Sequence, residues 1–445
     1  MLTNHTKKVI EKRVNQEPKK KILPSSGLTQ NTRKPHNSLY IKEDVKKEYI
    51  EKASTFGASP PSIFIGQRGY PQINAGPLLL PERRGRTVAS YDSSTHWLEK
   101  SIQEIIEMRS SLIHSKITIN AKRPMGNILI EKTQEIALSS DPVEIEVLFE
   151  KPPTLKLQFD DILTPLGPSG KIKRLNITEN PIVPRKVDAV VSDTDMPATE
   201  AINELYRAKI SEDHITRLLS TGLLGRRRRL VPTRWSITAT DDTIARELIK
   251  EIQDYQEVTE IEVYSGELLA NHFEIILLPK PYAFELVEIW ISESIWNQYK
   301  KKKSEDHNIK EDSPKSEKPW IGSDREDHRN RKKYSPLGGG YYAARLPVLE
   351  HLQAKQRRAT AIAIREVRPD YWAPLGVWVV REAARNALKN PPKTFETLNQ
   401  ALRHIHTKII TPHKHWQPQL QLLKEQNQRR ITDYTEIGSP FIGKC

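Results

Sequence analysis

The sequence contains a single cysteine among its 445 residues, Cys445. An intrachain disulfide needs two cysteines and a cysteine-based zinc site needs several, so both are excluded. Such sparing use of cysteine favours a reducing compartment, and we expect a cytoplasmic protein.

Long apolar runs are missing as well. Hydrophobic residues make up 37% of the chain, and no apolar run approaches the ~20 residues of a membrane span. The first residues, MLTNHTKKVIEKRVNQ, are charged and lack the apolar centre of a secretory signal. We therefore expect a soluble globular protein with no membrane partner and enough residues for two or three domains.

Two common catalytic motifs are also absent. The segment Gly167–Lys171 is too short for a phosphate-binding P-loop, and no H-E-x-x-H zinc-protease motif occurs. The histidines form two H-x-H pairs, but the first pair lies in a predicted helix, where residues two apart point in diverging directions. We predict no metal site from these four residues: His404, His406, His413 and His415.

Positive charge is present in excess, and it is distributed unevenly. The chain carries a formal net charge of +14. Residues 1–40 contribute +7, while residues 300–333 and 401–445 contribute +4 each, so the remaining body is almost neutral. Basic segments of this kind strengthen a contact with nucleic acid by releasing counterions. The alternative is that they serve only solubility.

The most distinctive segment is LSTGLLGRRRRLVPTRWSITATDDTI, residues 219–244. Guanidinium groups bind phosphates bidentately and stack on bases, and an exposed tryptophan can stack on a base. The alternatives are a solvated, charged loop and a tryptophan that fills the core. The predicted nucleic-acid or phosphate site comprises Arg226, Arg227, Arg228, Arg229, Arg234 and Trp235. Arg357, Arg358 and Arg381 could join it if the fold brings them there.

Carboxylates and hydroxyls lie in and near the same segment. Asp193 with Asp195, and Asp241 with Asp242, form two acidic pairs of the kind with which nucleases hold Mg²⁺ ions ~4 Å apart. The favoured alternative assigns helix capping to the second pair and a turn to the first. The catalytic residues are therefore unknown, and Mg²⁺ is a cofactor only if the protein is an enzyme. The candidates are Asp241, Asp242, Ser236 and Thr238.

The hydrophobic periodicity predicts an α+β fold in which helices flank an irregular mixed sheet. Helices are expected at about 93–113, 127–138, 198–209, 212–220, from Asp241 or Asp242 to 255, and at 342–356, 377–388 and 395–409. Strands are expected at 62–65, 143–149, 171–177, 188–191, 260–264, 273–278, 282–291 and 360–367.

Four blocks carry a family resemblance: STFGASPPSIFIGQRGYPQINAGPLL (54–79), LLSTGLLGRRRRLVPTRWSITATDDTI (218–244), GGYYAARLPVLEHLQAKQRRA (339–359) and PLGVWVVREAARNAL (374–388). In these blocks, over roughly residues 50–395, the chain resembles the archaeal Nre family of DNA-repair proteins. The resemblance implies a cytoplasmic archaeal protein that acts in DNA-damage repair and binds the DNA sliding clamp, PCNA, through a short C-terminal peptide. It implies no chemical activity. Many family members carry an N-terminal four-cysteine zinc motif, which this chain cannot form, so any DNA contact of that motif must be absent or replaced by the basic arm.

The C-terminal segment offers a candidate for the clamp-binding peptide. Gln428-Arg-Arg-Ile431-Thr-Asp-Tyr434-Thr435 fits the pattern Q-x-x-aliphatic-x-x-aromatic. One turn of 3₁₀ helix would place Ile431 and Tyr434 on the same side, ready to fill a hydrophobic pocket, while Gln428 hydrogen-bonds beside it. Thr435 stands where a second aromatic residue is usual, which should weaken the contact. A competing segment, Gln417–Leu423, has the glutamine and the aliphatic residue but no aromatic one.

These observations divide the chain into six parts: a disordered basic arm (1–48), an N-terminal region (49–196), a central region with the arginine-rich motif (197–299), a disordered charged insert (300–333), a helical C-terminal region (334–415) and a flexible tail with the clamp motif (416–445). The favoured function is a DNA-repair factor that binds DNA and is recruited to PCNA. Two alternatives remain: an enzyme of unknown reaction on DNA or a nucleotide, and an RNA-associated scaffold. A deep cleft with Arg234 facing Asp242 would favour the enzyme, and a flat basic surface would favour the binding module.

Overall fold

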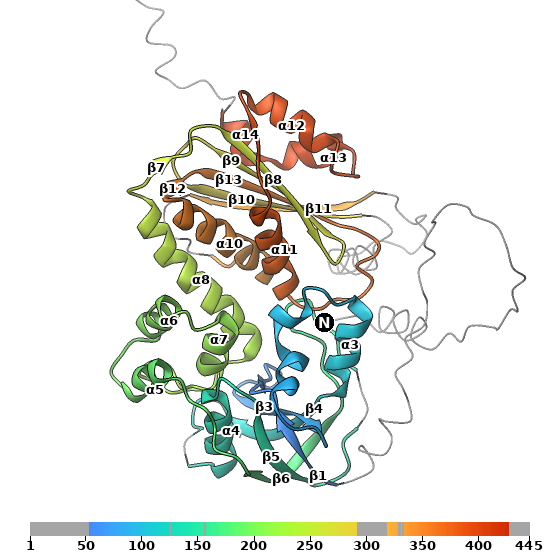
Figure 1. Cartoon of the computed structure of the whole chain (residues 1–445), viewed down its shortest axis with the longest axis vertical. Helices are drawn as coiled ribbons and strands as arrows, with labels where there is room; N and C mark the ends of the chain where they lie inside the picture. The colour runs from blue at the N-terminus through green and yellow to red at the C-terminus, as the bar shows by residue number, and fades with distance from the viewer. Residues whose placement is uncertain are drawn as a thin grey trace, which may run out of the picture.

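The computed structural model describes residues 53–124, 126–154, 157–291, 318–327, 331 and 333–426. The predicted basic arm (1–48) and the predicted clamp motif (428–435) lie outside these ranges. The fold is α+β, as the sequence predicts, with two six-stranded mixed sheets and helices around them (Figure 1). None of the described helices is long and apolar enough to cross a membrane.

The first sheet partly closes into a barrel. Its strand order is β1-β5-β6-β4-β3-β2, and a further pairing between β1 and β3 joins the two sides. The β4–β6 pair is parallel and the others are antiparallel. The strands are β1 (Ser54–Ser59), β2 (Ile63–Ile65), β3 (Gln72–Pro81), β4 (Ile113–Asn120), β5 (Val143–Phe149) and β6 (Ser169–Ile177).

The single helix expected over 93–113 is wrong. Two 3₁₀ helices, η1 (Arg86–Asp92) and η2 (Ser94–Trp97), precede a shorter helix α3 (Ile102–Ser111), and β4 begins at Ile113. Ser101 ends the irregular stretch because it forms a reciprocal capping box with Glu104, which satisfies two free amide groups. Helix α4 (Ile128–Leu138) is confirmed, and the Asn127 side chain caps it.

A helical segment joins the two sheets. It consists of α5 (Arg185–Ser192), α6 (Ala198–Arg207), α7 (Glu212–Ser220) and α8 (Thr233–Ile252). Residues 188–191 were expected to form a strand but belong to α5, because Val187 and Val190 lie three apart and bury one helical face. Helix α8 was expected to begin at Asp241 or Asp242, yet it begins eight residues earlier, directly after Pro232.

The second sheet has the order β11-β10-β13-β9-β8-β14, and only its β10–β13 pair is parallel. Helices α10 and α11 cover one face, while α12, α13 and α14 cover the other (Figure 1). Its strands are β8 (Ile261–Leu268), β9 (Asn271–Leu278), β10 (Ala283–Trp290), β11 (Trp320–Asp327), β13 (Thr360–Val367) and β14 (Lys393–Phe395), and a short pair, β7 (Gln256–Glu257) with β12 (Arg357–Arg358), lies apart. The helices are α10 (Gly339–Lys355), α11 (Trp378–Lys389), α12 (Leu398–His406), α13 (His413–Trp416) and α14 (Gln421–Gln426), with η3 (Gln417–Gln419) between the last two.

Strand β11 corrects the expectation that residues 300–333 are disordered throughout. Trp320–Asp327 pairs along its full length with β10 and forms one edge of the sheet. Every residue of β11 is only half-buried, so its polar sequence, WIGSDRED, lacks the apolar alternation that marks a strand. An edge strand can carry such charge because one side remains open to solvent.

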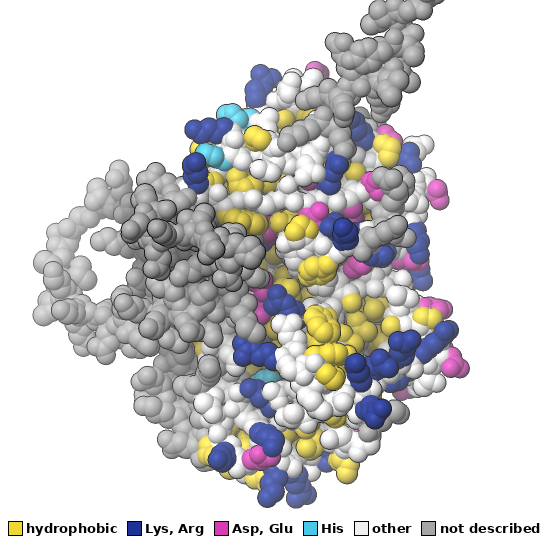
Figure 2. Space-filling model, turned by 180° about the vertical axis from the view of Figure 1, so that it is seen from behind, with side chains coloured by type: hydrophobic (Ala, Val, Ile, Leu, Met, Phe, Trp, Pro, Cys, Tyr) yellow, Lys and Arg dark blue, Asp and Glu magenta, His cyan; other side chains and the backbone are white. Residues whose placement is uncertain are grey.

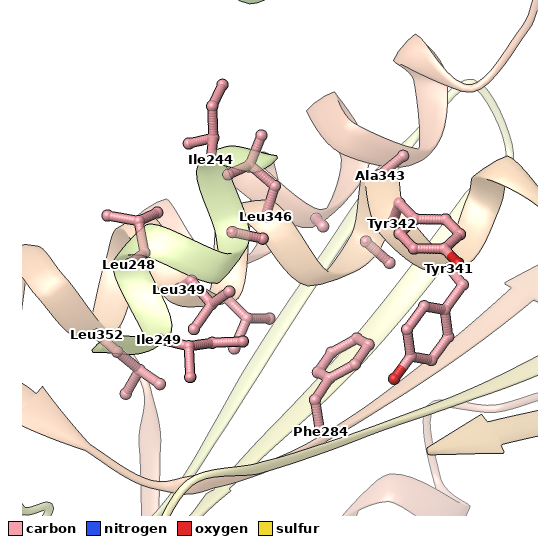
Figure 3. Packing of buried hydrophobic residues seen from close by; sticks show 14 of the residues in the cluster. Ile244, Leu248, Ile249, Phe284, Tyr341, Tyr342, Ala343, Leu346, Leu349 and Leu352 are labelled. Carbon is pink, nitrogen blue, oxygen red and sulfur yellow. The ribbon is translucent and has the colours of Figure 1, made fainter. Parts of the chain in front are cut away.

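The largest core packs α8 and α10 against the second sheet (Figure 3). Ile244, Leu248 and Ile249 of α8 meet Leu346, Leu349 and Leu352 of α10, and Tyr341 lies beside Phe284 of β10. Helix α8 therefore has two roles: its C-terminal half belongs to this core, and its N-terminal half is free to build a surface site.

Two buried histidines make stability depend on pH. Burial, assisted by Lys116, lowers the pKa of His114 to about 3, and burial, assisted by Arg217, lowers that of His214 to about 2. Below pH ~6.5 the unfolded chain binds a proton at each histidine, and the folded chain does not. Each unit by which the pH is lowered therefore reduces the free energy of unfolding by about 1.4 kcal/mol per histidine. Between pH 7 and pH 5 we expect a loss of about 2 kcal/mol from each. Guanidinium unfolding of His214→Gln at both pH values should show a correspondingly smaller loss, whereas an unchanged pH dependence would contradict this.

Candidate nucleic-acid interface

The four consecutive arginines occupy a tight loop between α7 and α8. Gly222 ends α7 with a left-handed backbone (φ 72°), and a Cβ there would lie 2.7 Å from the carbonyl oxygen of Arg229. The loop is attached on both sides. The amide of Val231 donates to the carbonyl of Ser220 at 2.9 Å, and that of Leu230 donates to the carbonyl of Ala121, beyond β4, at 3.0 Å. The loop is therefore a fixed part of the fold.

The four arginines divide into two pairs. Arg226 donates to the carbonyl of Asp195 at 2.6 Å, and Arg228, itself in a left-handed conformation, donates to the carbonyls of Val191 and Leu223. These two side chains hold the loop against α5. Arg227 and Arg229 are exposed and have no hydrogen bond or ion pair with any described residue. Both guanidinium groups of this second pair are therefore available to an external phosphate.

Aromatic side chains lie next to this loop. Trp235 is 46% exposed, which excludes the expectation that it fills the core, and its ring centroid lies 5.3 Å from that of Tyr70, itself 39% exposed. The ammonium group of Lys122 lies 5.9 Å from the Tyr70 ring. Since the amide of Leu230 donates to the carbonyl of Ala121, the segment that carries Lys122 lies beside the arginine loop. We call Arg227, Arg229, Lys122, Tyr70 and Trp235 the basic–aromatic surface.

Figure 2 shows one face of the molecule on which lysine and arginine side chains gather beside a hydrophobic patch in its lower half. Acidic side chains are sparse between them. Exposed aromatic rings next to unpaired cations are the two elements that a single-stranded nucleic acid requires.

Arg234 is not available in the same way, because it forms ion pairs with two adjacent carboxylates. Its guanidinium lies 2.7 Å from Asp160 and 2.8 Å from Asp161. Burial raises the pKa of Asp160, whereas for Asp161 burial is outweighed by the Arg234 guanidinium, which lowers the pKa. Arg234 thus neutralises part of an acidic wall instead of adding to the basic surface.

A cleft of about 1040 Å³ begins at Trp235 and extends between α8 and the segment that precedes α10. Arg234 and Asp242 both line it, as the enzyme alternative requires, but each is already paired within the protein. Its polar lining comprises Asp161, Arg234, Thr238, Asp242 and Ser335, and its aromatic lining Trp235, Trp320, Tyr334 and Tyr342. We call it the aromatic cleft.

The catalytic candidates on α8 point in different directions. Asp241 is buried and contacts Arg381 at 2.7 Å, while Asp242 contacts Arg345 at 2.6 Å and Arg246 at 2.7 Å. Successive helical residues diverge, so the two carboxylates do not face one site. The Asp193 side chain accepts hydrogen bonds from the backbone amides of Asp195 and Met196, as expected for a turn. Among the described residues, no group of three or more His, Cys, Asp or Glu side chains is arranged to hold a metal ion.

The two hydroxyl candidates are buried on α8. Ser236 is fully buried, and its hydroxyl lies 3.5 Å from the carbonyl of Val231. The hydroxyl of Thr238 is buried at the edge of the aromatic cleft and has no hydrogen-bond partner among the described residues.

Several residues of the site could not be found from the sequence. Lys122, Asp161 and Tyr334 lie far from the arginine cluster along the chain and meet it only in the fold. Tyr70 lies in one of the four blocks that carry the family resemblance, which was the one available signal. Arg358 and Arg381, considered as additions to the cluster, instead pair with Glu257 and Asp241.

The competing clamp peptide, Gln417–Leu423, belongs to the folded domain. Leu420 is fully buried and Leu423 nearly so, both in the core between α12 and the second sheet. These side chains cannot insert into a partner without unfolding that core.

Comparison with known proteins assigns the chain to a family. The profile of the family described as Archaeal Nre, N-terminal, matches residues 36–297, and that described as Archaeal Nre, C-terminal, matches residues 326–434. The chain belongs to the archaeal Nre family. No solved structure matches it.

Three relatives cover most of its length. The DNA repair protein NreA of Archaeoglobus fulgidus is 41% identical over 348 residues, which are 77% of this chain and 82% of the relative. The DNA repair protein NreB of the same organism is 35% identical, covering 85% of this chain and 91% of the relative. The DNA repair protein NreA of Haloferax volcanii is 35% identical, covering 82% and 85%.

Proposed function

We propose that this protein is a cytoplasmic DNA-repair factor that binds DNA through the basic–aromatic surface. The observation that carries the proposal is a pair of exposed arginines without partners among the described residues, Arg227 and Arg229, in the loop that leads into the helix carrying the exposed ring of Trp235. The guanidiniums would contact phosphates and the ring would stack on a base. The names of the relatives, all DNA repair proteins, support the process.

We also propose recruitment to the sliding clamp PCNA through Gln428, Ile431, Tyr434 and Thr435. The structure leaves this motif as the better of the two candidates, since the competing peptide is buried. The motif starts two residues after α14, and the C-terminal family profile extends to residue 434. The body would then meet DNA that already passes through the clamp.

The DNA-binding proposal predicts a change in salt dependence. Replacing Arg227 and Arg229 together by glutamine removes two phosphate contacts, so the slope of log K against log salt should become shallower by roughly 1.5. Fluorescence anisotropy with a labelled oligonucleotide at 50–200 mM salt measures this slope.

A matched control removes the same charge elsewhere. Lys389 and Arg403 are exposed and belong to α11 and α12, which pack on the second sheet and not on the arginine loop, so their replacement by glutamine should leave the slope within error of the wild type. Equal slopes for the wild type and the R227Q/R229Q variant would refute the proposed surface. The Arg228→Gln variant is unsuitable because Arg228 holds the loop itself.

A further inference from the structure

We infer that the aromatic cleft receives one unstacked base of the bound strand, while the phosphates on either side stay on the basic–aromatic surface. This inference rests on the proposed DNA binding and adds what the neighbouring cleft does. It assigns a ligand class, a neutral planar nucleobase, to a cavity of which the DNA-binding proposal uses only Trp235.

The charged groups of the cleft make it better suited to a base than to a phosphate. Its lining holds two carboxylates, Asp161 and Asp242, and one guanidinium, Arg234, which is already paired with the first. Asp242 is likewise paired, with Arg246 and Arg345, so among the described residues the lining offers a phosphate no free cation. Arg227 and Arg229, which pair with no described residue, precede α8 and are not part of the cleft lining. An anion is therefore attracted to the outer surface, and only a neutral group is suited to the interior.

The walls of the cleft suit a flat ring. Trp235 and Tyr334 are 46% and 58% exposed, and they are two of only seven large hydrophobic side chains that the described part of the chain leaves open to solvent. A third, Tyr70, contacts Trp235. Tyr334 is supported from behind by Tyr342, with ring centroids 5.4 Å apart. Exposed apolar side chains that cluster in this way mark interaction sites, and bases stack on such rings.

The cleft also offers hydrogen-bonding groups for the edge of a base. The Thr238 hydroxyl is nine-tenths buried and unpartnered among the described residues, an arrangement that normally costs free energy. A hydroxyl can donate or accept, and the nearby Asp242 carboxylate can accept. The volume of about 1040 Å³ lies at the upper end of the range for small-molecule sites, roughly 300–1000 Å³.

The geometry of the chain links the two sites. Trp235 follows Arg229 by six residues, so their Cα atoms are at most about 22 Å apart. Trp235 itself belongs to both the surface and the cleft. A strand held at Arg229 can therefore deliver a base to the cleft within a few nucleotides.

The test compares two oligonucleotides of equal length and charge, a thymidine oligomer and one with abasic residues in place of the bases. We expect the wild type to bind the base-bearing oligomer about tenfold more tightly. Tyr334→Ala should remove most of this preference without changing the salt slope, and Tyr334→Phe should retain it because the ring remains. The R227Q/R229Q variant should weaken binding to both oligomers and keep their ratio.

The outcomes separate the two proposals. If the salt slope responds to R227Q/R229Q but the wild type binds both oligomers equally, or Tyr334→Ala keeps the preference, the cleft does not take a base and the surface proposal stands. If the slope does not respond, the surface proposal fails as well. Melting temperatures of the variants within error of the wild type establish that they are folded.

Photocrosslinking provides a second readout. An oligonucleotide containing 5-iodouracil should crosslink, on irradiation, to an aromatic residue that lines the cleft without belonging to the basic–aromatic surface: Trp320, Tyr334 or Tyr342. Crosslinks that mass spectrometry places only outside these residues would overturn the inference.

Discussion

Replacing Arg381 by methionine is expected to lower the free energy of unfolding by about 3–5 kcal/mol. Arg381 of α11 contacts both carboxylate oxygens of Asp241 in α8, at 2.7 and 2.8 Å, and both side chains are almost fully buried. Burial raises the pKa of Asp241, and the Arg381 guanidinium opposes this rise. Without Arg381 a buried carboxylate would remain uncompensated, so the variant must either keep a costly charge or bind a proton.

The pH dependence of this variant identifies the cause. With its opposing guanidinium removed, folded Asp241 binds a proton more tightly than the unfolded chain does, so lower pH favours the folded variant. The stability gap between R381M and the wild type should therefore narrow from pH 7 to pH 5 in guanidinium unfolding. The double variant D241L/R381M removes both charges and should recover most of the loss. A gap independent of pH, or no recovery in the double variant, would show that the ion pair is not responsible.

Replacing both Ile431 and Tyr434 by alanine is expected to weaken clamp binding by about a hundredfold or more. Two apolar side chains buried in a pocket contribute roughly 1.5–3 kcal/mol each, and a tenfold change in affinity corresponds to 1.4 kcal/mol. Calorimetric titration of the full-length chain into the PCNA of its source measures the effect.

The opposite substitution provides the control. Thr435 occupies the position at which clamp-binding peptides commonly have a second aromatic residue. Thr435→Phe should therefore tighten binding by about tenfold, because a further ring is buried. Unchanged affinity in the alanine variant would refute the motif, and the buried segment Gln417–Leu423 could not take its place.

Much of the fold could be predicted because its signals are local. Strand β5 alternates buried and exposed residues, and α7 begins and ends where its polar cap and its glycine indicate. The failures have a common origin in tertiary contacts. Val190 and Val191 favour a strand, but packing places them in α5, and β11 is a strand because β10 lies beside it.

The sequence predicted which residues belong to the site better than it predicted the role of each residue. The cluster that includes Arg227, Arg229 and Trp235 was identified from its sequence, and each of these three side chains is exposed. The partners of Arg234 were not identified from the sequence, because Asp160 precedes Arg234 by 74 residues and nothing in either segment indicates their contact. Whether an arginine is free or paired depends on such distant residues, and that distinction decides which of them can hold a phosphate.

Because α14 ends at Gln426, only a short length of chain separates the folded body from the proposed clamp motif. Ile431 follows by five residues, a length of chain that spans at most about 18 Å. If the tail docks on the clamp, the folded body must sit almost against the ring and cannot range along the chromosome. Along duplex DNA, at 3.4 Å per base pair, this maximum length corresponds to about five base pairs. Any lesion that the body contacts would therefore lie where the DNA leaves the clamp.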